Sequence, residues 1–304
     1  MLDRLINWVS RKSPKSPESS SANVERESPK ETFKIGEVNA SLIGARGAVL
    51  NDGSPNTADG YLFNKNSNHI IIFDATGSND PTKANECKQL LGERLKSDSQ
   101  DLEKPENIPG KCIEIIVSDK AIHVGAEDGI VYVFRHNDGK IQVECLYALC
   151  ENQVYIGGDG YVRYLEKGRL VTDIVTKPQP GKKLETDNSW RRVSTLIKND
   201  LGTVICVIAC TDGFTDEVYR TQSTKGSVSL EGMFDGLNSS MRAYAAQLEL
   251  IISNNQPISE AVKLLQKEII LGEEVYYTNS KNNEDDKTIV IIPIIPIAPT
   301  PTTQ

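Results

Sequence analysis

The sequence alternates short hydrophobic runs with polar turns, and some of the runs border acidic residues. Val204 to Cys210 is apolar throughout, as is typical of a strand buried on both faces, and it ends at Thr211-Asp-Gly213. Ile70 to Phe73 is a second such run, and Asp74 follows it directly. We expect both segments to be buried strands that end in turns.

Further segments have the apolar content and the flanking turn residues of strands. Asn137-Asp-Gly139 and Glu151-Asn152 separate neighbouring runs in the middle of the chain, which indicates antiparallel strands joined by tight turns. The additional predicted strands are Asp59 to Phe63, Ile130 to Phe134, Ile141 to Leu149, Gln153 to Ile156, Tyr161 to Leu165 and Thr288 to Ile292.

Apolar residues at helical spacing predict helices in two parts of the chain. Pro81 suits a first helical position, and a helical stripe of apolar residues follows it. Two more helices are expected over Leu237 to Ser253 and Ser259 to Leu271. Ile113 to Val124 also fits a helical pattern, although a strand through Ile113 to Val117 fits as well.

Strands and helices therefore come in blocks, which favours an α+β fold of antiparallel sheets with helices packed outside them. We expect residues 35–293 to form the folded domain. Residues 1–34 should be a disordered tail, in which residues 1–12 could form a short amphipathic helix with weak contact to a membrane or a partner. Residues 294–304 should be a proline-rich extended tail.

The composition excludes several classes of protein. The chain has 304 residues, 38% of them hydrophobic, and a net charge of −8, which argues against a nucleic-acid binder because an acidic domain repels phosphate backbones. The six cysteines show no paired CxxC spacing, so we expect reduced core thiols rather than a zinc or disulfide framework. We expect a cytoplasmic protein, because its thiols should be reduced and no run is long enough to span a bilayer, and we also expect a monomer.

The acids at the strand ends suggest a metal site. A buried charge is costly without a cation or several donors, so Asp212 and Asp74 are candidate ligands, although a structural role for such an aspartate is about as common. Glu284-Asp-Asp-Lys-Thr288 similarly leads into the last apolar run. Ligands that are all carboxylates favour Mg²⁺ or Mn²⁺ over zinc.

Four short segments of the chain resemble motifs of the metal-dependent serine/threonine protein phosphatases of type 2C, and they follow one another in the same order as in that family. Thr211-Asp-Gly-Phe-Thr-Asp216 matches the family's (Ser/Thr)-Asp-Gly-Leu-x-Asp closely, and Asp285-Asp-Lys-Thr288 matches its terminal Asp-Asn-x-Thr. Phe73-Asp-Ala-Thr-Gly-Ser78 resembles the Asp-Gly-(His or Met)-Gly-Gly element, and Gly158 to Gly168 resembles Gly-Asp-Ser-Arg-Ala-Tyr-Leu…Gly. The resemblance covers roughly residues 38–293.

The resemblance implies a four-layer sandwich of two antiparallel β-sheets flanked by α-helices, and hydrolysis of phosphoproteins by water that two Mn²⁺ or Mg²⁺ ions activate. No side chain would act as the nucleophile. Asp74 and Asp212 would be the catalytic residues because they hold the metal that activates the water. The implied metal ligands are Asp59, Asp74, the carbonyl of Ala75, Asp212 and Asp285, with Asp159 and Asp216 at a third, weaker ion.

The sequence departs from the family pattern at four places, one of which is Tyr161 at the position of the arginine in Gly-Asp-Ser-Arg. The opening Asn-Glu-Asp motif is Asn56-Thr-Ala-Asp59, so Ala58 replaces a metal-binding glutamate. Thr76 stands where many members have a histidine, and no arginine lies just before the opening motif, so Arg46 is our assignment for phosphate binding. Two alternatives stay open: an inactive or weakly active pseudophosphatase that serves as a binding module, and an unrelated α+β protein whose acids decorate turns.

Overall fold

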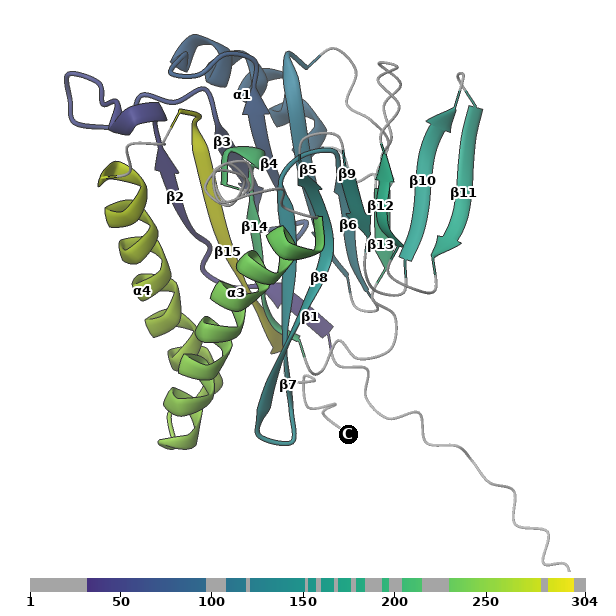
Figure 1. The fold of residues 1–304 in the computed structure, drawn as a ribbon, viewed down its shortest axis with the longest axis vertical. Helices are drawn as coiled ribbons and strands as arrows, with labels where there is room; N and C mark the ends of the chain where they lie inside the picture. Colours follow the sequence, from purple (N-terminus) through teal and green to yellow (C-terminus); the bar gives the residue numbers. More distant parts are fainter. Residues whose placement is uncertain are drawn as a thin grey trace, which may run out of the picture. The chain divides into compact units, whose positions relative to one another are not determined.

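The computed structural model describes residues 32–96, 108–118, 121–150, 153–156, 160–166, 169–175, 179–183, 193–196, 204–214, 230–279 and 284–297. Their strands form two sheets in which every pair of neighbours is antiparallel (Figure 1). The first, eight-stranded sheet has the order β1 (Thr32–Ile35), β15 (Lys287–Ile297), β14 (Val204–Cys210), β7 (Ile130–Asn137), β8 (Lys140–Cys150), β9 (Gln153–Ile156) and β12 (Gln179–Lys183), and β2 (Asn39–Ile43) also pairs with β15.

The second sheet has seven strands. Its order is β11 (Arg169–Val175), β10 (Gly160–Glu166), β13 (Val193–Leu196), β6 (Ile122–Ala126), β5 (Gly110–Val117), β4 (His69–Ala75) and β3 (Gly60–Asn64).

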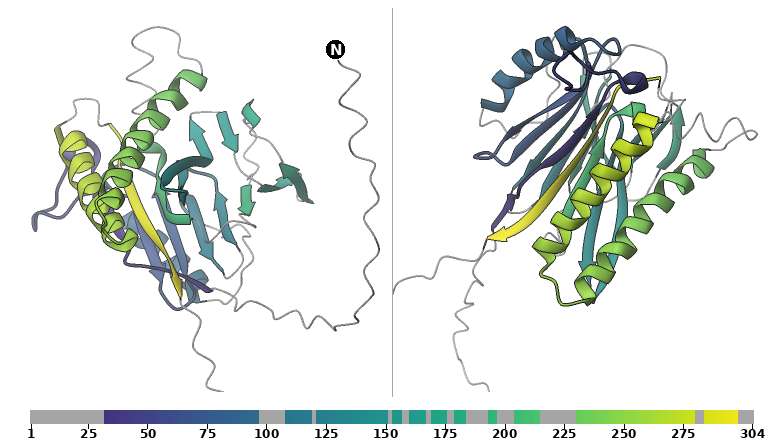
Figure 2. Two further views of the ribbon diagram at one scale, coloured as in Figure 1. Left: turned by 90° about the horizontal axis from the view of Figure 1, so that it is seen from below. Right: turned by 90° about the vertical axis from the view of Figure 1, so that its left-hand side faces the viewer.

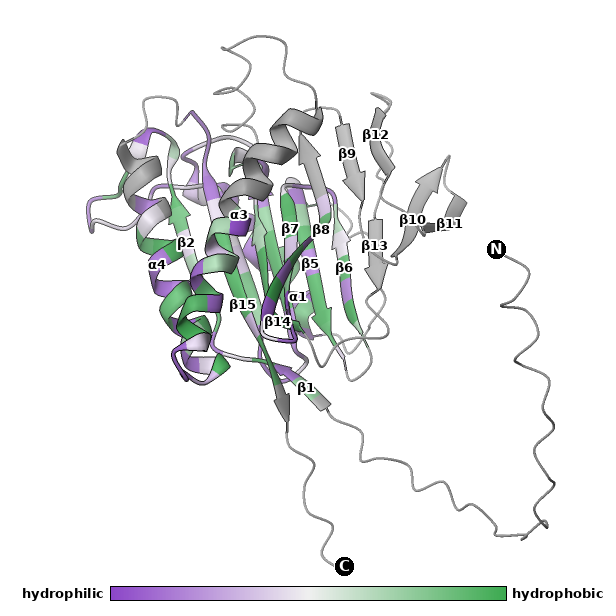
Figure 3. Ribbon diagram, turned by 60° about the horizontal axis from the view of Figure 1, so that its bottom comes forward, coloured by the Kyte–Doolittle hydropathy of each residue, from purple (hydrophilic) through white to green (hydrophobic). Residues whose placement is uncertain are grey.

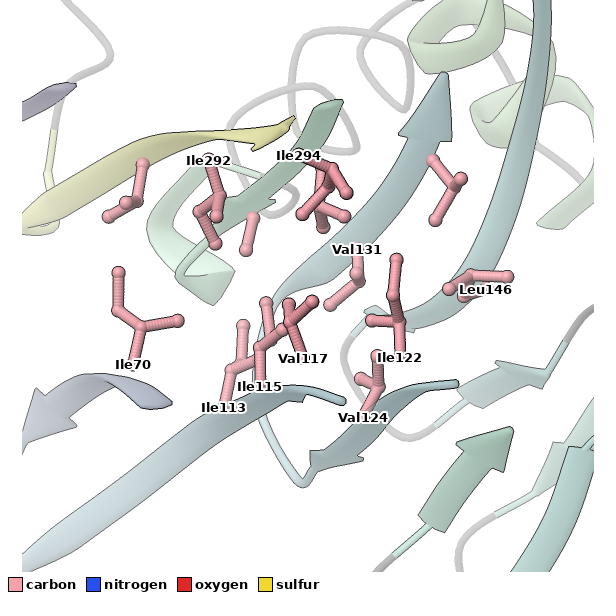
Figure 4. Close-up of a cluster of buried hydrophobic side chains, with 14 of the residues drawn as sticks. Ile70, Ile113, Ile115, Val117, Ile122, Val124, Val131, Leu146, Ile292 and Ile294 are labelled. Carbon is pink, nitrogen blue, oxygen red and sulfur yellow. The ribbon is translucent and has the colours of Figure 1, made fainter. Parts of the chain in front are cut away.

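The main core lies between the two sheets. Because side chains alternate along a strand, Val131 and Val133 of β7 face this core while their neighbours face away from it. Figure 4 shows side chains of the second sheet, such as Ile113 and Val124, opposite Ile292 of the first. Stacking of two apolar sheet faces accounts for the isoleucine and valine content of these strands.

Two helices, α3 (Leu230–Ser253) and α4 (Ile258–Asn279), lie side by side on the outer face of the first sheet (Figure 2). Leu248 of α3 and Leu265 of α4 are buried in the same apolar cluster as Ile208 of β14. The outward side of α4 is polar for much of its length, so the helix alternates between hydrophilic and hydrophobic residues in Figure 3. Strand β14 is therefore buried on both faces, as its apolar run predicts.

Helix α1 (Pro81–Lys96) covers the outer face of the second sheet. Asp80 caps it by accepting the backbone N–H of Thr82 at 3.0 Å. A buried ion cluster also ties the helix to the sheet, because the guanidinium of Arg94 donates to both carboxylate oxygens of Glu114, at 2.7 and 2.9 Å, while Glu114 lies 2.7 Å from Nε2 of His69. The protein thus has four layers, with a helical layer on each side of the sandwich.

The architecture confirms the predicted α+β sandwich, with corrections to individual elements. The helix predicted over Ile113 to Val124 is wrong: this segment forms β5 and β6, because its alternate residues Ile113, Ile115 and Val117 face the inter-sheet core. The predicted helix from Pro81 is confirmed, and α3 and α4 are longer than expected.

Paired strands extend past the two domain boundaries predicted at residues 35 and 293. Strand β1 begins at Thr32, and β15 runs through Pro293 and Pro296 to Ile297. Proline lacks the N–H that an interior strand needs, but beyond Pro293 the strand pairs with β1 alone.

Two further expectations concern the cysteines and the membrane. Among the described side chains, five cysteines form no disulfide: Cys87, Cys112, Cys145, Cys206 and Cys210. Among the described helices, none combines the length and hydrophobicity needed to cross a bilayer.

Candidate metal centre

Acidic residues gather at one edge of the sandwich because antiparallel neighbours bring the start of one strand beside the end of the next. In the second sheet, Asp59 directly precedes β3 and Asp74 lies near the end of β4. In the first sheet, Asp212 follows β14, and Asp285 and Asp286 precede β15. Residues far apart in the sequence therefore meet at the same place.

Three carboxylates form the centre of this cluster. One oxygen from each of Asp74, Asp128 and Asp212 lies within 4.8 Å of the others. Asp128 lies on the link between β6 of the second sheet and β7 of the first, so the chain crosses from one sheet to the other at this residue. Oxygens this close from three separate elements can share one small cation.

Two buried carboxylate oxygens in the cluster have no hydrogen-bond partner among the described residues: Oδ2 of Asp128 and Oδ1 of Asp59. Asp128 is completely buried, and its other oxygen accepts the backbone N–H of Asp212 at 3.2 Å. Since a buried polar atom without a partner is unfavourable, these oxygens indicate a site made for a positively charged ligand.

Burial and mutual repulsion change the acidity of the cluster. Burial, together with the negative charge of Asp212, raises the pKa of Asp74 to about 7, although the ammonium group of Lys111 opposes this rise. Burial also raises the pKa of Asp128 and of Asp59 well above the usual range, and the neighbouring acids add to the effect. Strongly shifted groups that face one another are typical of functional sites.

The hydroxyl of Thr211 connects the two sheets beside the cluster. Its Oγ1 donates to Oδ2 of Asp59 at 2.8 Å and accepts the backbone N–H of Thr288 at 2.9 Å. The backbone N–H of Thr211 donates in turn to the carbonyl of Thr288 at 3.0 Å. This threonine therefore fixes the orientation of Asp59 relative to β14 and β15.

Asp286 has a structural role next to Asp285. Its carboxylate accepts three backbone N–H groups, from Ala45, Ala58 and Asn79, at 2.6 to 2.7 Å. These bonds hold three loops at the same edge of the sandwich. Asp285 is more exposed and accepts the hydroxyl of Ser78 at 2.9 Å, so it remains at the rim.

Glycines allow the backbones at the site to approach one another. A Cβ at Gly129 would lie 1.7 Å from the carbonyl oxygen of Cys210, and its φ of +53° also favours glycine. A Cβ at Gly110 would lie 2.1 Å from the carbonyl oxygen of Asp74. The first contact positions Asp128 behind Asp212, and the second brings the start of β5 against the end of β4.

Lys111 adds a positive charge to the cluster. It pairs with Asp74 in the register between β4 and β5, and its Nζ lies 2.6 Å from Oδ2 of Asp212. The site opens to solvent through a pocket of about 310 Å³, lined by Asp74, Ala75, Thr76, Gly77, Ser78, Gly110, Lys111, Asp212, Asp285 and Asp286.

The structure brings together most of the ligands that the sequence suggested. Asp74, Ala75, Asp212 and Asp285 line the pocket, and Asp59 is buried and bonded to Thr211 of the same cluster. Asp159 and Asp216, predicted at a third ion, lie outside the described residues. Arg46, assigned to phosphate binding, is exposed and is not among the residues that line the pocket.

The sequence patterns did not single out Asp128 or Lys111. Glu127-Asp-Gly129 does precede the apolar run of β7, as Glu284 to Asp286 precede that of β15, so the same acid-before-strand pattern could have indicated Asp128. Lys111 gave no such signal, because its position depends on the register with Asp74.

Ala58 and Thr76, which depart from the phosphatase pattern, both have contacts within the fold. Ala58 is buried in the apolar cluster under α1, and its N–H donates to Asp286. Thr76 is exposed, and its hydroxyl donates to the carbonyl of Pro109 at 3.0 Å. Neither Ala58 nor Thr76 offers a carboxylate or an imidazole at its position.

The carboxylates of the cluster fit a hard divalent cation. The donor set consists of carboxylate oxygens, of which Oδ2 of Asp128 and Oδ1 of Asp59 lack hydrogen-bond partners in the described structure. The described residues that line the pocket include no histidine or cysteine. Such donors suit Mg²⁺ or Mn²⁺ better than zinc or copper.

No protein-family model and no curated protein sequence matches this chain. The solved structures that resemble it include phosphatases. The phosphatase domain of SpoIIE from Bacillus subtilis, with a fragment of its regulatory domain, is 14% identical with a TM-score of 0.44, over 88% of this chain and 66% of that one. The RsbU and RsbW domains of Rv1364c from Mycobacterium tuberculosis are 12% identical with a TM-score of 0.47, over 89% and 62%. This chain thus spans less than two thirds of the length of either.

The serine-threonine phosphatase 2C of Toxoplasma gondii is 12% identical with a TM-score of 0.36, over 86% of this chain and 95% of that one. Other matched structures are the catalytic domain of PstP with two manganese ions and RsbX with magnesium. Because the likeness is weak in each case, the chemistry of this site has to follow from its own residues.

Proposed function

We propose that this protein is a metal-dependent phosphoprotein phosphatase that hydrolyses phosphoserine or phosphothreonine with Mg²⁺ or Mn²⁺ as cofactor. The observation on which the proposal depends is the convergence of Asp74, Asp128 and Asp212 from three separate strand ends, with oxygens within 4.8 Å of one another. When bound, divalent ions would supply a more acidic water and neutralise charge on a phosphate group.

The residues of this chain would bind the metal ion and orient its ligands. Asp74 and Asp212 line the pocket and would hold the ion from the solvent side, while Asp128 would hold it from behind. Asp59, which Thr211 orients, would coordinate the ion directly or through water, and so would Asp285 at the rim. The pocket of about 310 Å³ is open enough for a phosphorylated side chain on a protein surface. We propose that the protein acts as a monomer.

The test is hydrolysis of p-nitrophenyl phosphate and of a phosphothreonine peptide by the full chain with Mn²⁺, Mg²⁺ or EDTA. We expect turnover only with metal, and its loss in Asp74→Asn and Asp212→Asn. The matched control is Asp138→Asn, because Asp138 lies in the exposed turn between β7 and β8 at φ 48°, where asparagine fits equally well. Metal-independent turnover, or full activity in both site variants, would contradict the proposal.

A second candidate is a pseudophosphatase that binds metal without efficient turnover. Two observations favour it: the position of the expected glutamate ligand is the buried Ala58, and Thr76 at the position of the proton donor is bonded to Pro109. Metal binding in calorimetry without turnover of either substrate would support this candidate over the enzyme.

A further inference from the structure

Lys111 is the only basic residue among the described residues that line the pocket. The other charged residues of the lining are Asp74, Asp212, Asp285 and Asp286. The Lys111 side chain is 46% exposed and lines the pocket, and its ammonium group contacts the carboxylate of Asp212. An ion pair at this exposure contributes little to the stability of the fold.

The pairing of β4 with β5 fixes the backbone position of Lys111 beside the metal ligands. Lys111 lies directly opposite Asp74 in the register of β4 and β5, and the preceding pair is Gly110 with Ala75. Because the carbonyl of Asp74 leaves no room for a side chain at Gly110, Lys111 is the first residue of β5 that can project a side chain beside the metal ligands. Its Nζ spans from the second sheet to Asp212 of the first, at 2.6 Å.

A divalent ion held by Asp74 and Asp212 would share Asp212 with this ammonium group. Two positive charges a few ångströms apart repel, so binding of the ion favours a shift of Nζ away from Asp212. The lysine side chain has a flexible four-carbon stem and three donors, and it can make that shift without movement of the strand. The open pocket is where the shifted ammonium would meet a phosphate oxygen.

We propose that Lys111 is the phosphate-binding cation of this pocket and exchanges Asp212 for a phosphate oxygen of the substrate when the divalent ion binds. The inference rests on the proposed function. It gives Lys111 the role for which the sequence suggested Arg46, a residue that is exposed and not part of the pocket lining. Lys111 would also lower the metal affinity, since the ion competes with it for Asp212.

The experiment compares Lys111→Gln and Lys111→Arg with the parent chain by titration calorimetry. The first titration uses Mn²⁺ alone, and the second uses inorganic phosphate at saturating Mn²⁺. Lys65→Gln is the matched control, because Lys65 lies in the exposed turn between β3 and β4, away from the pocket. Thermal unfolding in EDTA establishes that each variant is folded.

We expect Lys111→Gln to bind Mn²⁺ about threefold to tenfold more tightly and phosphate about tenfold more weakly than the parent, because the competing charge and the phosphate donor are lost together. Lys111→Arg should restore much of the phosphate affinity. With p-nitrophenyl phosphate, the KM of Lys111→Gln should rise by a larger factor than kcat falls. Lys65→Gln should match the parent in all three measurements.

Unchanged phosphate affinity in Lys111→Gln would overturn the inference. Weaker Mn²⁺ binding in that variant would overturn it too, since Lys111 would then be holding the carboxylates in place. Failure of the proposed function is distinguishable: it would show as a parent chain that does not bind Mn²⁺, or that binds Mn²⁺ without turnover of p-nitrophenyl phosphate. A parent that binds Mn²⁺ and phosphate and turns the substrate over, with no effect of Lys111→Gln, contradicts the role of Lys111 alone.

Discussion

Thr211 donates its hydroxyl hydrogen to Oδ2 of Asp59 at 2.8 Å, and this bond joins strand ends that belong to different sheets. The same hydroxyl accepts the backbone N–H of Thr288. The threonine in the Thr211-Asp212-Gly213 sequence is therefore part of the framework that orients the buried carboxylate, while the aspartate beside it faces the pocket.

Replacement of Thr211 by valine should destabilise the protein. Thr211→Val keeps the shape but leaves Asp59, which is 2% exposed, and the N–H of Thr288 without this partner, so we expect the free energy of unfolding to fall by about 1–3 kcal/mol. Thr211→Ser retains the hydroxyl and should lose less. Urea unfolding measures both variants, and equal stability of the valine and serine variants would show that the hydroxyl contributes nothing.

Asp128→Asn should reduce metal affinity although Asp128 was not a sequence candidate. The variant removes a buried negative charge whose Oδ2 has no partner in the described structure, so we expect Mn²⁺ binding to weaken about tenfold. In EDTA the variant should unfold at the same or a higher temperature than the parent, because the buried charge costs stability. Calorimetry checks the affinity, and Mn²⁺ affinity equal to that of the parent would exclude Asp128 as a ligand.

Stability without metal should depend on pH through Asp74. Its pKa rises from 3.8 to about 7 on folding, so between these values the folded state binds more protons than the unfolded state. The contribution of Asp74 to stability is therefore fully present below about pH 4 and is lost as the pH rises through about 7.

The measurement is the melting temperature in EDTA at several pH values between about 5 and 8.5, for the parent and for Asp74→Asn. We expect the parent to lose stability relative to the variant as the pH rises, since only the parent acquires the charge. Saturating Mn²⁺ should reduce the difference. A constant offset between the two proteins across this range would mean that Asp74 does not titrate in it.

Gly129→Ala should be more destabilising than Gly53→Ala, although both glycines have a positive φ. A Cβ at Gly53, whose φ is +82°, would have no atom within 4 Å, so Gly53→Ala measures the cost of the left-handed conformation, about 1–2 kcal/mol. Gly129→Ala adds the clash with the carbonyl of Cys210, at about 1–3 kcal/mol more. Urea unfolding measures both variants. An equal loss in the free energy of unfolding for Gly53→Ala and Gly129→Ala would contradict this close approach.

The sequence by itself determined much of the architecture. Apolar runs such as Val204 to Cys210 predict strands buried on both faces because such a run has no polar side to expose. The stripe after Pro81 predicts α1 because a helix buries one face. The acids beside the strand ends indicated where a metal could bind, and Asp74, Asp212 and Asp285 do meet in one pocket.

Only the tertiary structure decided the rest. Ile113 to Val124 has a helical pattern in sequence, with a strand through Ile113 to Val117 as the alternative. The second sheet selects strands because that places alternate residues in the inter-sheet core. Asp128 and Lys111 join the site through a crossover between sheets and a strand register, which pair residues far apart in the chain. Local patterns report which residues are apolar or turn-forming, whereas the distance between two charged side chains depends on how the sheets stack.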